Sequence, residues 1–336
     1  MRGRMQSIGA MGAKVCVAAC AWGALVMPAL AKDKKPPVPT QTIVTVESHE
    51  RGGAPAPTVT NADIIVKENG KLDEVTGWQA VSKQDKTQLV ILIDDSLSAG
   101  ASINFSTISQ FILQLPSTVQ VAVGYMQYGR VAIAAGFTAD RNTVAKSIRL
   151  PSGIRGVNAS PYLCLSDIAK NWPYGGSPAV VRQVLMITDG VDRYFDTRQY
   201  DPGDPYLNTA IKDAQKNRLI VSSIYYRDTG FVDKGLNGSF VGGSYLIQVA
   251  EATGGKTYYE GMGNPVTFDP FLKAYMQRMA SAYLLSFNAH GSGLQSLKVN
   301  TKVHGVRLAA PDHVIVGQQL SAVTESPSAS VARVSQ

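Results

Sequence analysis

The chain has 336 residues, of which 45% are hydrophobic and 17% are charged. The apolar fraction is sufficient for a large buried core and excludes intrinsic disorder over most of the length. A net charge of +7 and three cysteines would suit nucleic-acid binding, redox chemistry or a metal site. Much of this signal, however, lies in the first 31 residues.

Residues 1–31 have the pattern of a secretory signal peptide. Arg2, Arg4 and Lys14 precede an uncharged run that ends in the small-x-small sequence of a cleavage site. We therefore predict export to the periplasm or secretion, with no integral membrane segment after cleavage. A retained membrane anchor and a lipoprotein signal at Cys20 are the alternatives, although the apolar run is short for either.

Removing this leader changes both the net charge and the number of cysteines. Its three basic residues leave 29 basic against 25 acidic residues, a net charge of +4 without a basic cluster. Cys16 and Cys20 leave as well, so Cys164 has no partner for an intrachain disulfide and is predicted to be a core thiol on a helix. We expect neither nucleic-acid binding nor a cysteine metal site.

The central region, residues 87–280, alternates between two patterns. Continuous apolar runs typical of strands buried on both faces occur at Leu89–Ile93, Val119–Tyr125, Val184–Ile187 and Leu219–Tyr225. Helical spacing separates them, at Phe105–Leu113, Tyr162–Ala169, Tyr206–Lys216, Tyr245–Ala252 and Phe271–Tyr283. This alternation predicts an α/β fold with a doubly wound, mostly parallel sheet. Val131–Phe137 is predicted as its antiparallel edge strand, and the glycine-rich Gly235–Gly243 as a mobile loop.

Shorter strands flank this region on both sides. Residues 32–40 are predicted as a basic, proline-rich linker, 41–86 as an N-terminal β segment, 281–316 as a C-terminal β segment and 317–336 as a flexible tail. Within the N-terminal segment, Asn69-Gly70 between two strand patterns indicates a hairpin. We expect the two flanking segments to meet.

Acids and hydroxyls follow two of the predicted buried strands. Asp94 ends the first, with Ser96 and Ser98 two and four residues beyond, and Asp189 follows a second. Because ligands bind at the carboxyl ends of parallel strands where the strand order reverses, these side chains should lie close together, with Ser160 from a nearby loop. Each alone could be an ordinary strand-end acid or helix cap. Together they form an oxygen set that suits Mg²⁺, or another divalent cation such as Mn²⁺ or Ca²⁺.

This arrangement resembles a known family. Asp94-x-Ser96-x-Ser98 and Thr188-Asp189-Gly190 are similar to the metal-ion-dependent adhesion site of von Willebrand factor A-type domains. The segment Val249–Tyr259, with its Thr-Gly-Gly and paired tyrosines, resembles the end of that domain. Val59–Lys71 is similar to the lead-in of A-type-domain proteins first described in acidobacteria. The resemblance covers roughly residues 87–280 and implies a doubly wound, mostly parallel six-stranded sheet.

The resemblance implies protein binding through a cation. Asp94, Ser96, Ser98 and Ser160 would hold the ion and Asp189 would often act through water, while an acidic group of a partner protein completes the coordination. The long stretches at residues 193–205 and 229–244 would set specificity.

The sequence departs from the family's pattern at two positions. Ser160 stands where the family usually has threonine, and so keeps the hydroxyl but loses the methyl group. Asp95 replaces a small residue, and its carboxylate could strengthen metal binding or repel an acidic ligand.

Two other functions are alternatives to cation-dependent protein binding. An envelope scaffold could keep the fold without using the metal. An Mg²⁺-dependent hydrolase is disfavoured because a Gly-x-Ser-x-Gly elbow is absent and the histidines lie outside the central region, at His49, His290, His304 and His313. The acid that haloacid-dehalogenase chemistry needs two residues after the first is replaced by Ser96. We expect no enzymatic activity.

Overall fold

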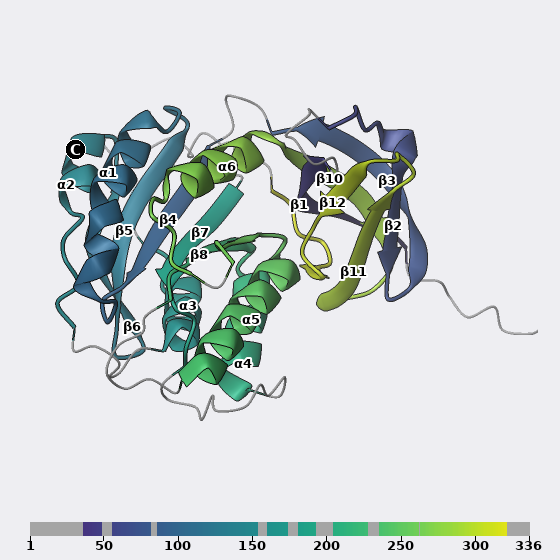
Figure 1. The fold of residues 1–336 in the computed structure, drawn as a ribbon. Helices are drawn as coiled ribbons and strands as arrows, with labels where there is room; N and C mark the ends of the chain where they lie inside the picture. The colour runs from purple at the N-terminus through teal and green to yellow at the C-terminus, as the bar shows by residue number, and fades with distance from the viewer. Residues whose placement is uncertain are drawn as a thin grey trace, which may run out of the picture. The chain divides into compact units, whose positions relative to one another are not determined.

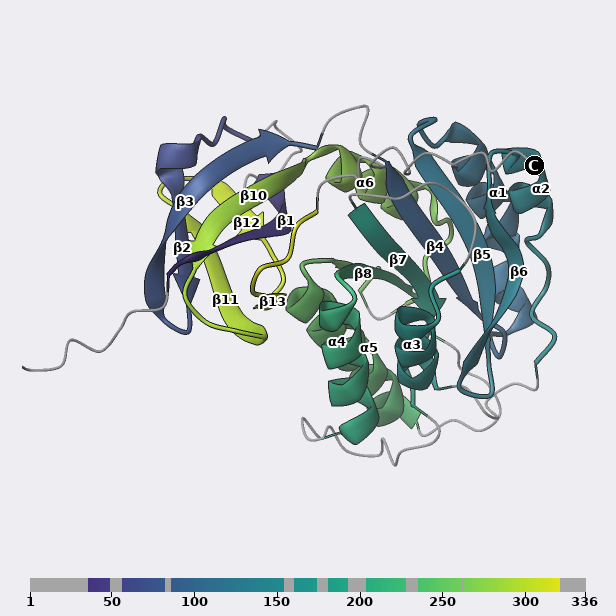
Figure 2. The same cartoon turned by 180° about the vertical axis from the view of Figure 1, so that it is seen from behind.

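The computed structural model describes residues 36–48, 56–81, 86–153, 160–173, 181–192, 204–227, 235–261 and 263–320. The predicted signal peptide, residues 1–31, lies outside this range. Within the described residues the chain forms one six-stranded and one seven-stranded β-sheet (Figures 1 and 2).

The six-stranded sheet is mostly parallel. It consists of β4 (Thr87–Asp94), β5 (Val119–Gln127), β6 (Arg130–Thr138), β7 (Val181–Thr188), β8 (Leu219–Tyr225) and β9 (Thr257–Tyr258). The strand order is β6-β5-β4-β7-β8-β9, and only β6, at one edge, runs antiparallel to its neighbour. The order therefore reverses at β4, as in doubly wound folds. The predicted fold class and the antiparallel edge strand are both confirmed.

Helices cover both faces of this sheet. Buried side chains of α1 (Phe105–Gln114), α2 (Arg141–Lys146) and α6 (Asp269–Ala280) belong to the hydrophobic core on one face. Those of α3 (Pro161–Lys170), α4 (Pro205–Lys216) and α5 (Gly235–Thr253) belong to the core on the other. Short 3-10 helices occur at Asn61–Asp63 (η1) and Ala99–Asn104 (η2).

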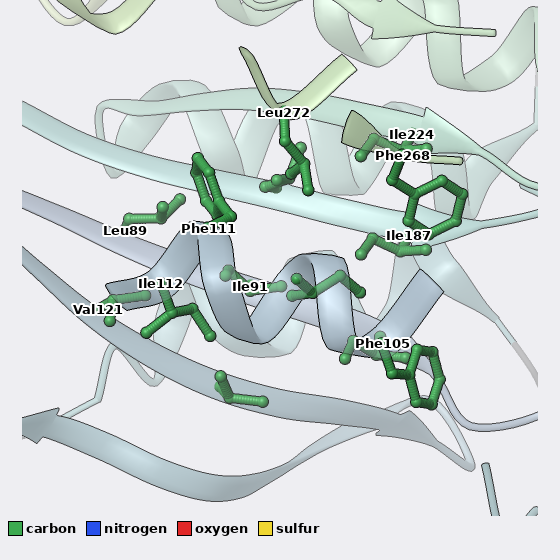
Figure 3. Packing of buried hydrophobic residues seen from close by; sticks show 14 of the residues in the cluster. Leu89, Ile91, Phe105, Phe111, Ile112, Val121, Ile187, Ile224, Phe268 and Leu272 are labelled. Atoms are coloured by element: carbon green, nitrogen blue, oxygen red, sulfur yellow. The ribbon is translucent and has the colours of Figure 1, made fainter. Parts of the chain in front are cut away.

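Alternate residues of β4 point into the two cores. Leu89, Ile91 and Ile93 pack with α1 and α6, as Figure 3 shows for Leu89 and Ile91, whereas Val90 and Leu92 pack with the helices on the opposite face. All five side chains are fully buried. Because neither face meets water, the strand reads as one apolar run rather than as an alternation.

The seven-stranded sheet combines both ends of the described chain. Its strands are β1 (Val38–Ser48), β2 (Ile64–Glu68), β3 (Lys71–Ala80), β10 (Ala282–Ala289), β11 (Leu294–Thr301), β12 (Val306–Ala309) and β13 (His313–Ile315). The order is β12-β1-β10-β3-β2-β11-β13, with antiparallel neighbours. Since β10 pairs with both β1 and β3, the prediction that the two flanking segments meet is confirmed.

The predicted hairpin joins β2 to β3. Asn69 and Gly70 have positive φ angles of 48° and 80°, which a two-residue turn between antiparallel strands requires. Trp78 of β3 stacks on Tyr283 of β10 with ring centroids 4.5 Å apart, and its indole N–H donates to the carbonyl of Val59 at 3.0 Å. The sheet thus has its own aromatic and aliphatic core, centred on side chains such as Phe287.

The prediction of a mobile loop at Gly235–Gly243 is wrong, because these residues begin α5. The glycines disfavour a helix locally. One of them, however, allows a close tertiary approach: a side chain at Gly242 would overlap the backbone of Asp189 and Gly190. Packing of the helix against the end of β7 therefore overrides the local preference.

Smaller differences concern element ends. The helix predicted to reach Tyr283 ends at Ala280, because β10 begins at Ala282 and pairs with β1. The strand β1 begins at Val38, within the stretch predicted as a linker. The first residues of the predicted tail contact the same strand, since the backbone N–H of Gln41 donates to Gln318 at 2.8 Å. Residues 321–336 lie outside the described range.

Among the helices of the described residues, none is both long and apolar enough to cross a membrane.

Candidate metal centre

The candidate centre lies at the carboxyl ends of β4 and β7. These strands are parallel neighbours, with Ile93 opposite Ile187, so Asp94 and Thr188 end them side by side. On its other side β4 pairs with β5, which the chain reaches through α1. The strand order thus reverses between β4 and β7, which is where open α/β sheets bind ligands.

Asp94 is fully buried and held by hydroxyl groups. One carboxylate oxygen, Oδ1, accepts hydrogen bonds from the Ser96 N–H at 2.9 Å and the Ser96 hydroxyl at 2.7 Å. The other, Oδ2, accepts from the Thr188 hydroxyl at 2.7 Å. Burial raises the pKa of Asp94 to about 6 and the charge of Asp189 adds to the shift, while the hydrogen bonds from Ser96 and Thr188 oppose it. A cation would therefore be favoured here.

A tight turn after β7 presents further carboxylates. Gly190 has a positive φ of 69°, and the Val191 N–H donates to Asp189 Oδ1 at 2.9 Å. Asp192, which is fully buried, accepts a hydrogen bond from the Ser160 hydroxyl at 3.1 Å. Two acids thus follow β7 within four residues, and both are buried.

Ser160 is the N-cap of α3. Its hydroxyl oxygen accepts a hydrogen bond from the Leu163 N–H at 3.2 Å while its proton goes to Asp192. The structure therefore brings Ser160 to Asp192 rather than to Asp94. One lone pair of the hydroxyl remains, so coordination of a cation by Ser160 stays a prediction.

Tyr162, two residues after Ser160, lies near several carboxylates that affect its pKa. The Tyr162 hydroxyl donates to the Gly190 carbonyl at 2.7 Å. Burial raises its pKa well above the ordinary value, and the charges of Asp192, Asp189 and Asp204 raise it further. Asp204 caps α4, and its Oδ2 is buried without a hydrogen-bond partner among the described residues. Several acids therefore share this end of the sheet.

Ser98 stands at the start of η2. It occupies the N-cap position in an extended conformation but makes no side-chain cap hydrogen bond. The residue is half-buried, and its hydroxyl does not fill the capping role that serine usually has at a helix start. A function as cation ligand is compatible with this placement and remains a prediction.

Asp95 is held away from this centre by its own partners. Arg149 donates to both of its oxygens, at 2.6 and 3.2 Å, and Ser152 and Gln127 donate as well. Burial alone would raise the pKa of Asp95, but the hydrogen bonds from Arg149, Ser152 and Gln127 outweigh it and lower the pKa. The Arg149 guanidinium also lies over the Tyr125 ring, 3.8 Å from its centroid. The extra carboxylate therefore forms a structural ion pair.

The donor set fits a hard divalent cation. Asp94, Asp189 and the serine hydroxyls offer oxygen ligands, which Mg²⁺, Mn²⁺ and Ca²⁺ prefer. Among the described groups that shift the pKa of Asp94, none is a cation. Buried like charges are costly without a counter-ion, so a bound dication would relieve the repulsion between Asp94 and Asp189.

Sequence reasoning did not single out Thr188 and Asp192, which the structure joins by hydrogen bonds to Asp94 and Ser160. Thr188 was part of the recognised motif, but its hydrogen bond to Asp94 requires the parallel pairing of two strands. Asp192 follows Asp189 by three residues, and a turn at a glycine was the available signal. Of the predicted specificity segments, 193–205 and 229–244, residues 193–203 and 229–234 lie outside the described residues. The described part, from Asp204 and from Gly235, forms the starts of α4 and α5.

Comparisons with known proteins give similarities of fold. No protein-family model and no curated protein matches the chain. Among solved structures it is similar to a von Willebrand factor type A protein from Catenulispora acidiphila, at 12% identity over 84% of this chain and 74% of that one, with a TM-score of 0.41. An aerotolerance-related membrane protein from Bacteroides fragilis matches at 16% identity, over 57% and 98% of the two chains, with a TM-score of 0.41. BatB from Bacteroides thetaiotaomicron matches at 16% identity, over 58% and 97%, with a TM-score of 0.40. Likeness of this degree transfers neither a ligand nor a partner to this chain.

Proposed function

We propose that residues 87–280 form a von Willebrand factor A-type domain that binds a partner protein through a divalent cation. Asp94, Ser96, Ser98, Ser160 and Asp189 would hold the cation, with Mg²⁺ as the first choice. The proposal rests above all on Asp94, a fully buried carboxylate at the reversal of strand order whose pKa is raised by burial and by Asp189.

The residues of the chain have distinct tasks in this proposal. Ser96 and Thr188 orient the Asp94 carboxylate by hydrogen bonds to its two oxygens. The Val191 N–H orients Asp189, and Arg149 engages Asp95 so that it does not compete for the ion. A cation bound mainly by neutral hydroxyls and few carboxylates stays electrophilic, and an acidic side chain of a partner can coordinate it.

Export and the absence of catalysis belong to the same proposal. The signal-peptide pattern of residues 1–31 supports a protein that functions in the periplasm or outside the cell. Oxygen ligands without a histidine in the central region support binding rather than general acid–base chemistry. Turnover that Asp94→Asn abolishes would contradict the second statement.

A Mg²⁺ titration of thermal stability tests the metal site. Mg²⁺ should raise the melting temperature of the wild type, because an ion that binds only the folded state stabilises it by mass action. Asp94→Asn should abolish the response. Asp95→Asn is the matched control: it removes a neighbouring buried carboxylate that Arg149 already neutralises, so the response should persist. A wild type that ignores Mg²⁺, Mn²⁺ and Ca²⁺ would refute the cation site and favour the scaffold alternative.

Partner binding is tested separately by cross-linked capture from the native cell envelope. The purified chain should retain the same partner in Mg²⁺ and release it in EDTA, and Asp94→Asn should behave as the wild type does in EDTA. A partner that binds equally well under all three conditions would indicate a scaffold that does not use the metal.

A further inference from the structure

Three potential metal ligands gather on the seven-stranded sheet, outside the site described above. Glu68, Asp73 and His290 each place one ligand atom within 4.8 Å of the others. Within the described residues, no other group of three or more carboxylate, imidazole or thiol side chains is gathered in this way. The cluster joins residues that are more than 200 positions apart in the sequence.

The topology explains why these residues meet. Glu68 ends β2 and pairs with Lys71, while Asp73 of β3 pairs with Val66, so the two acids are diagonal neighbours on one face of the hairpin. His290 follows β10 and begins the connection to β11. Because β3 and β2 lie between β10 and β11 in the sheet, this connection must pass the β2–β3 hairpin.

Glu68 holds the connection in place. Its carboxylate accepts hydrogen bonds from the His290 N–H at 2.7 Å and from the Gly291 N–H at 3.0 and 3.2 Å. A side chain at Gly291 would overlap Glu68 Oε1, so glycine permits the close approach. Carboxylate oxygens together offer about four lone-pair sites, so these bonds orient Glu68 and still leave it able to bind a cation.

The buried carboxylate of Asp73 has one oxygen without a partner in the described part of the chain, which indicates that a ligand is missing from the cluster. Its side chain is only 1% exposed, and Oδ2 is buried with no hydrogen-bond partner among the described residues. The other oxygen, Oδ1, lies 3.1 Å from His290 Nδ1. Burial raises the pKa of Asp73, the hydrogen bond with His290 opposes this, and the charge of Glu68 raises it further. Buried carboxylate oxygens are rarely left unpaired, so the open position at Oδ2 points to a ligand beside this cluster of two acids and one imidazole.

We propose that Glu68, Asp73 and His290 form a second cation site, selective for a Zn²⁺-type ion over Mg²⁺ and Ca²⁺. An imidazole nitrogen combined with carboxylates favours borderline ions such as Zn²⁺, whereas Mg²⁺ and Ca²⁺ prefer oxygen alone. Ligands about 2.0–2.2 Å from one tetrahedral Zn²⁺ lie roughly 3.3–3.6 Å from each other, so Nδ1 and Oδ1, which are 3.1 Å apart, need to separate by only a few tenths of an ångström to bind one ion.

The site would act as a clip between the two flanking segments. The His290 side chain is 53% exposed, which gives an ion access from solvent and leaves room for a water ligand. A bound ion would tie the β2–β3 hairpin, from the N-terminal flank, to the β10–β11 connection, from the C-terminal flank. This role does not depend on the cation proposed at Asp94.

Metal binding by the tag-free full chain tests the proposal. Equilibrium dialysis with Zn²⁺ alone, followed by metal analysis, should show one ion bound that His290→Ala removes or weakens at least about tenfold. His313→Ala is the matched control, because His313 also lies beside an acid, Asp312, at 2.8 Å and is similarly exposed, but is not part of a three-ligand group. It should bind Zn²⁺ as the wild type does, and so should Asp94→Asn.

Two further measurements keep the outcome clear. Zn²⁺ should raise the melting temperature of the wild type and of Asp94→Asn but not of His290→Ala, whereas Mg²⁺ should act through Asp94 alone. Should His290→Ala fail to fold by circular dichroism, Asp73→Asn takes its place, since it keeps the shape of the side chain. Absence of Zn²⁺ binding by the wild type, or equal binding by wild type and the His290 or Asp73 variant, would overturn the proposal.

Discussion

The two sheets bring acids together in different ways. At the edge of the six-stranded sheet, Asp94 and Asp189 follow neighbouring parallel strands and are oriented by hydroxyls and backbone N–H groups. On the seven-stranded sheet, Glu68 and Asp73 belong to one antiparallel hairpin and His290 comes from a connection that passes it. The first set offers oxygen alone and the second adds nitrogen, so the two sites should select different ions.

The difference also concerns rigidity. The turn after β7 is packed against the backbone of α5, so little can move there without disturbing the core. The connection after β10 packs against side chains instead, and its His290 and Gly291 N–H groups donate hydrogen bonds to the Glu68 carboxylate. Substitutions at the glycines of the two sites should therefore differ in their cost.

The largest effect is expected for Gly190→Ala. Gly190 has φ 69°, and an added Cβ would overlap the Gly242 backbone and approach Leu246 Cγ to 2.7 Å. We expect a loss of about 3–5 kcal/mol in the free energy of unfolding, measured with urea, together with the Mg²⁺ response. Gly70→Ala, with φ 80° but open space around it, should cost only about 1 kcal/mol. Equal costs would show that α5 does not approach the turn closely.

The pH dependence of stability should separate Asp94 from other acids. Its pKa is raised from 3.8 to about 6 in the folded state, so folding favours the protonated form. Its contribution is therefore fully present below pH 4 and is lost as the pH rises through 6, by on the order of 2–3 kcal/mol. In EDTA, the free energy of unfolding of Asp94→Asn should change less between pH 4 and 7 than that of the wild type. Saturating Mg²⁺ should flatten the wild-type curve too, because the ion compensates the charged form. Parallel curves for wild type and variant would rule this out.

Arg149→Met should destabilise the protein by about 2 kcal/mol, because Asp95 is buried and loses its cation. Hydrogen bonds from Ser152 and Gln127 remain and Arg149 is partly exposed, which limits the loss. The lowered pKa of Asp95 implies that this ion pair stabilises above the unfolded pKa and fades as the pH falls below it. Urea unfolding at pH 7 and pH 3 should therefore show a smaller difference between wild type and variant at pH 3. Loss of the Mg²⁺ response would mean that Asp95 belongs to the metal site after all.

The smallest loss of stability is expected for Gly291→Ala, at about 1 kcal/mol, because the groups that an added Cβ would displace belong to the side chains of Glu68 and Gln295 and not to the backbone. The same displacement should abolish Zn²⁺ binding in equilibrium dialysis and leave the Mg²⁺ response intact. Retained Zn²⁺ binding would show that Glu68 is not a ligand.

Much of the central sheet could be predicted because its signals are local. Strands covered on both faces leave continuous apolar runs, and Asp94 and Asp189 follow such runs directly. The same logic located the edge strand β6 and the Asn69-Gly70 hairpin. Short elements without a periodic pattern, such as α2 and β12, gave no such signal.

Other features depend on residues that are distant in sequence. The partner of Asp95 is Arg149, 54 positions away, so the sequence alone suggested an extra charge at the metal site where the structure has an ion pair. The first half of α5 contains several glycines and resembles a loop until the turn at Gly190 is placed against Gly242. In each case a tertiary contact outweighs the local preference.

The sequence by itself determined the α/β architecture, the acids at the strand ends and the hydroxyls beside Asp94. These features depend on the local pattern of apolar residues and on residues that are close together in the sequence. Only the tertiary structure decided which side chains contact these acids and which acids lie together. Pairing of β4 with β7 joins Thr188 to Asp94, and the sheet order of β10, β3 and β2 brings His290 to Glu68 and Asp73. The physical reason is that strand pairing and helix packing set these distances in space. The separation of two residues along the chain does not determine them.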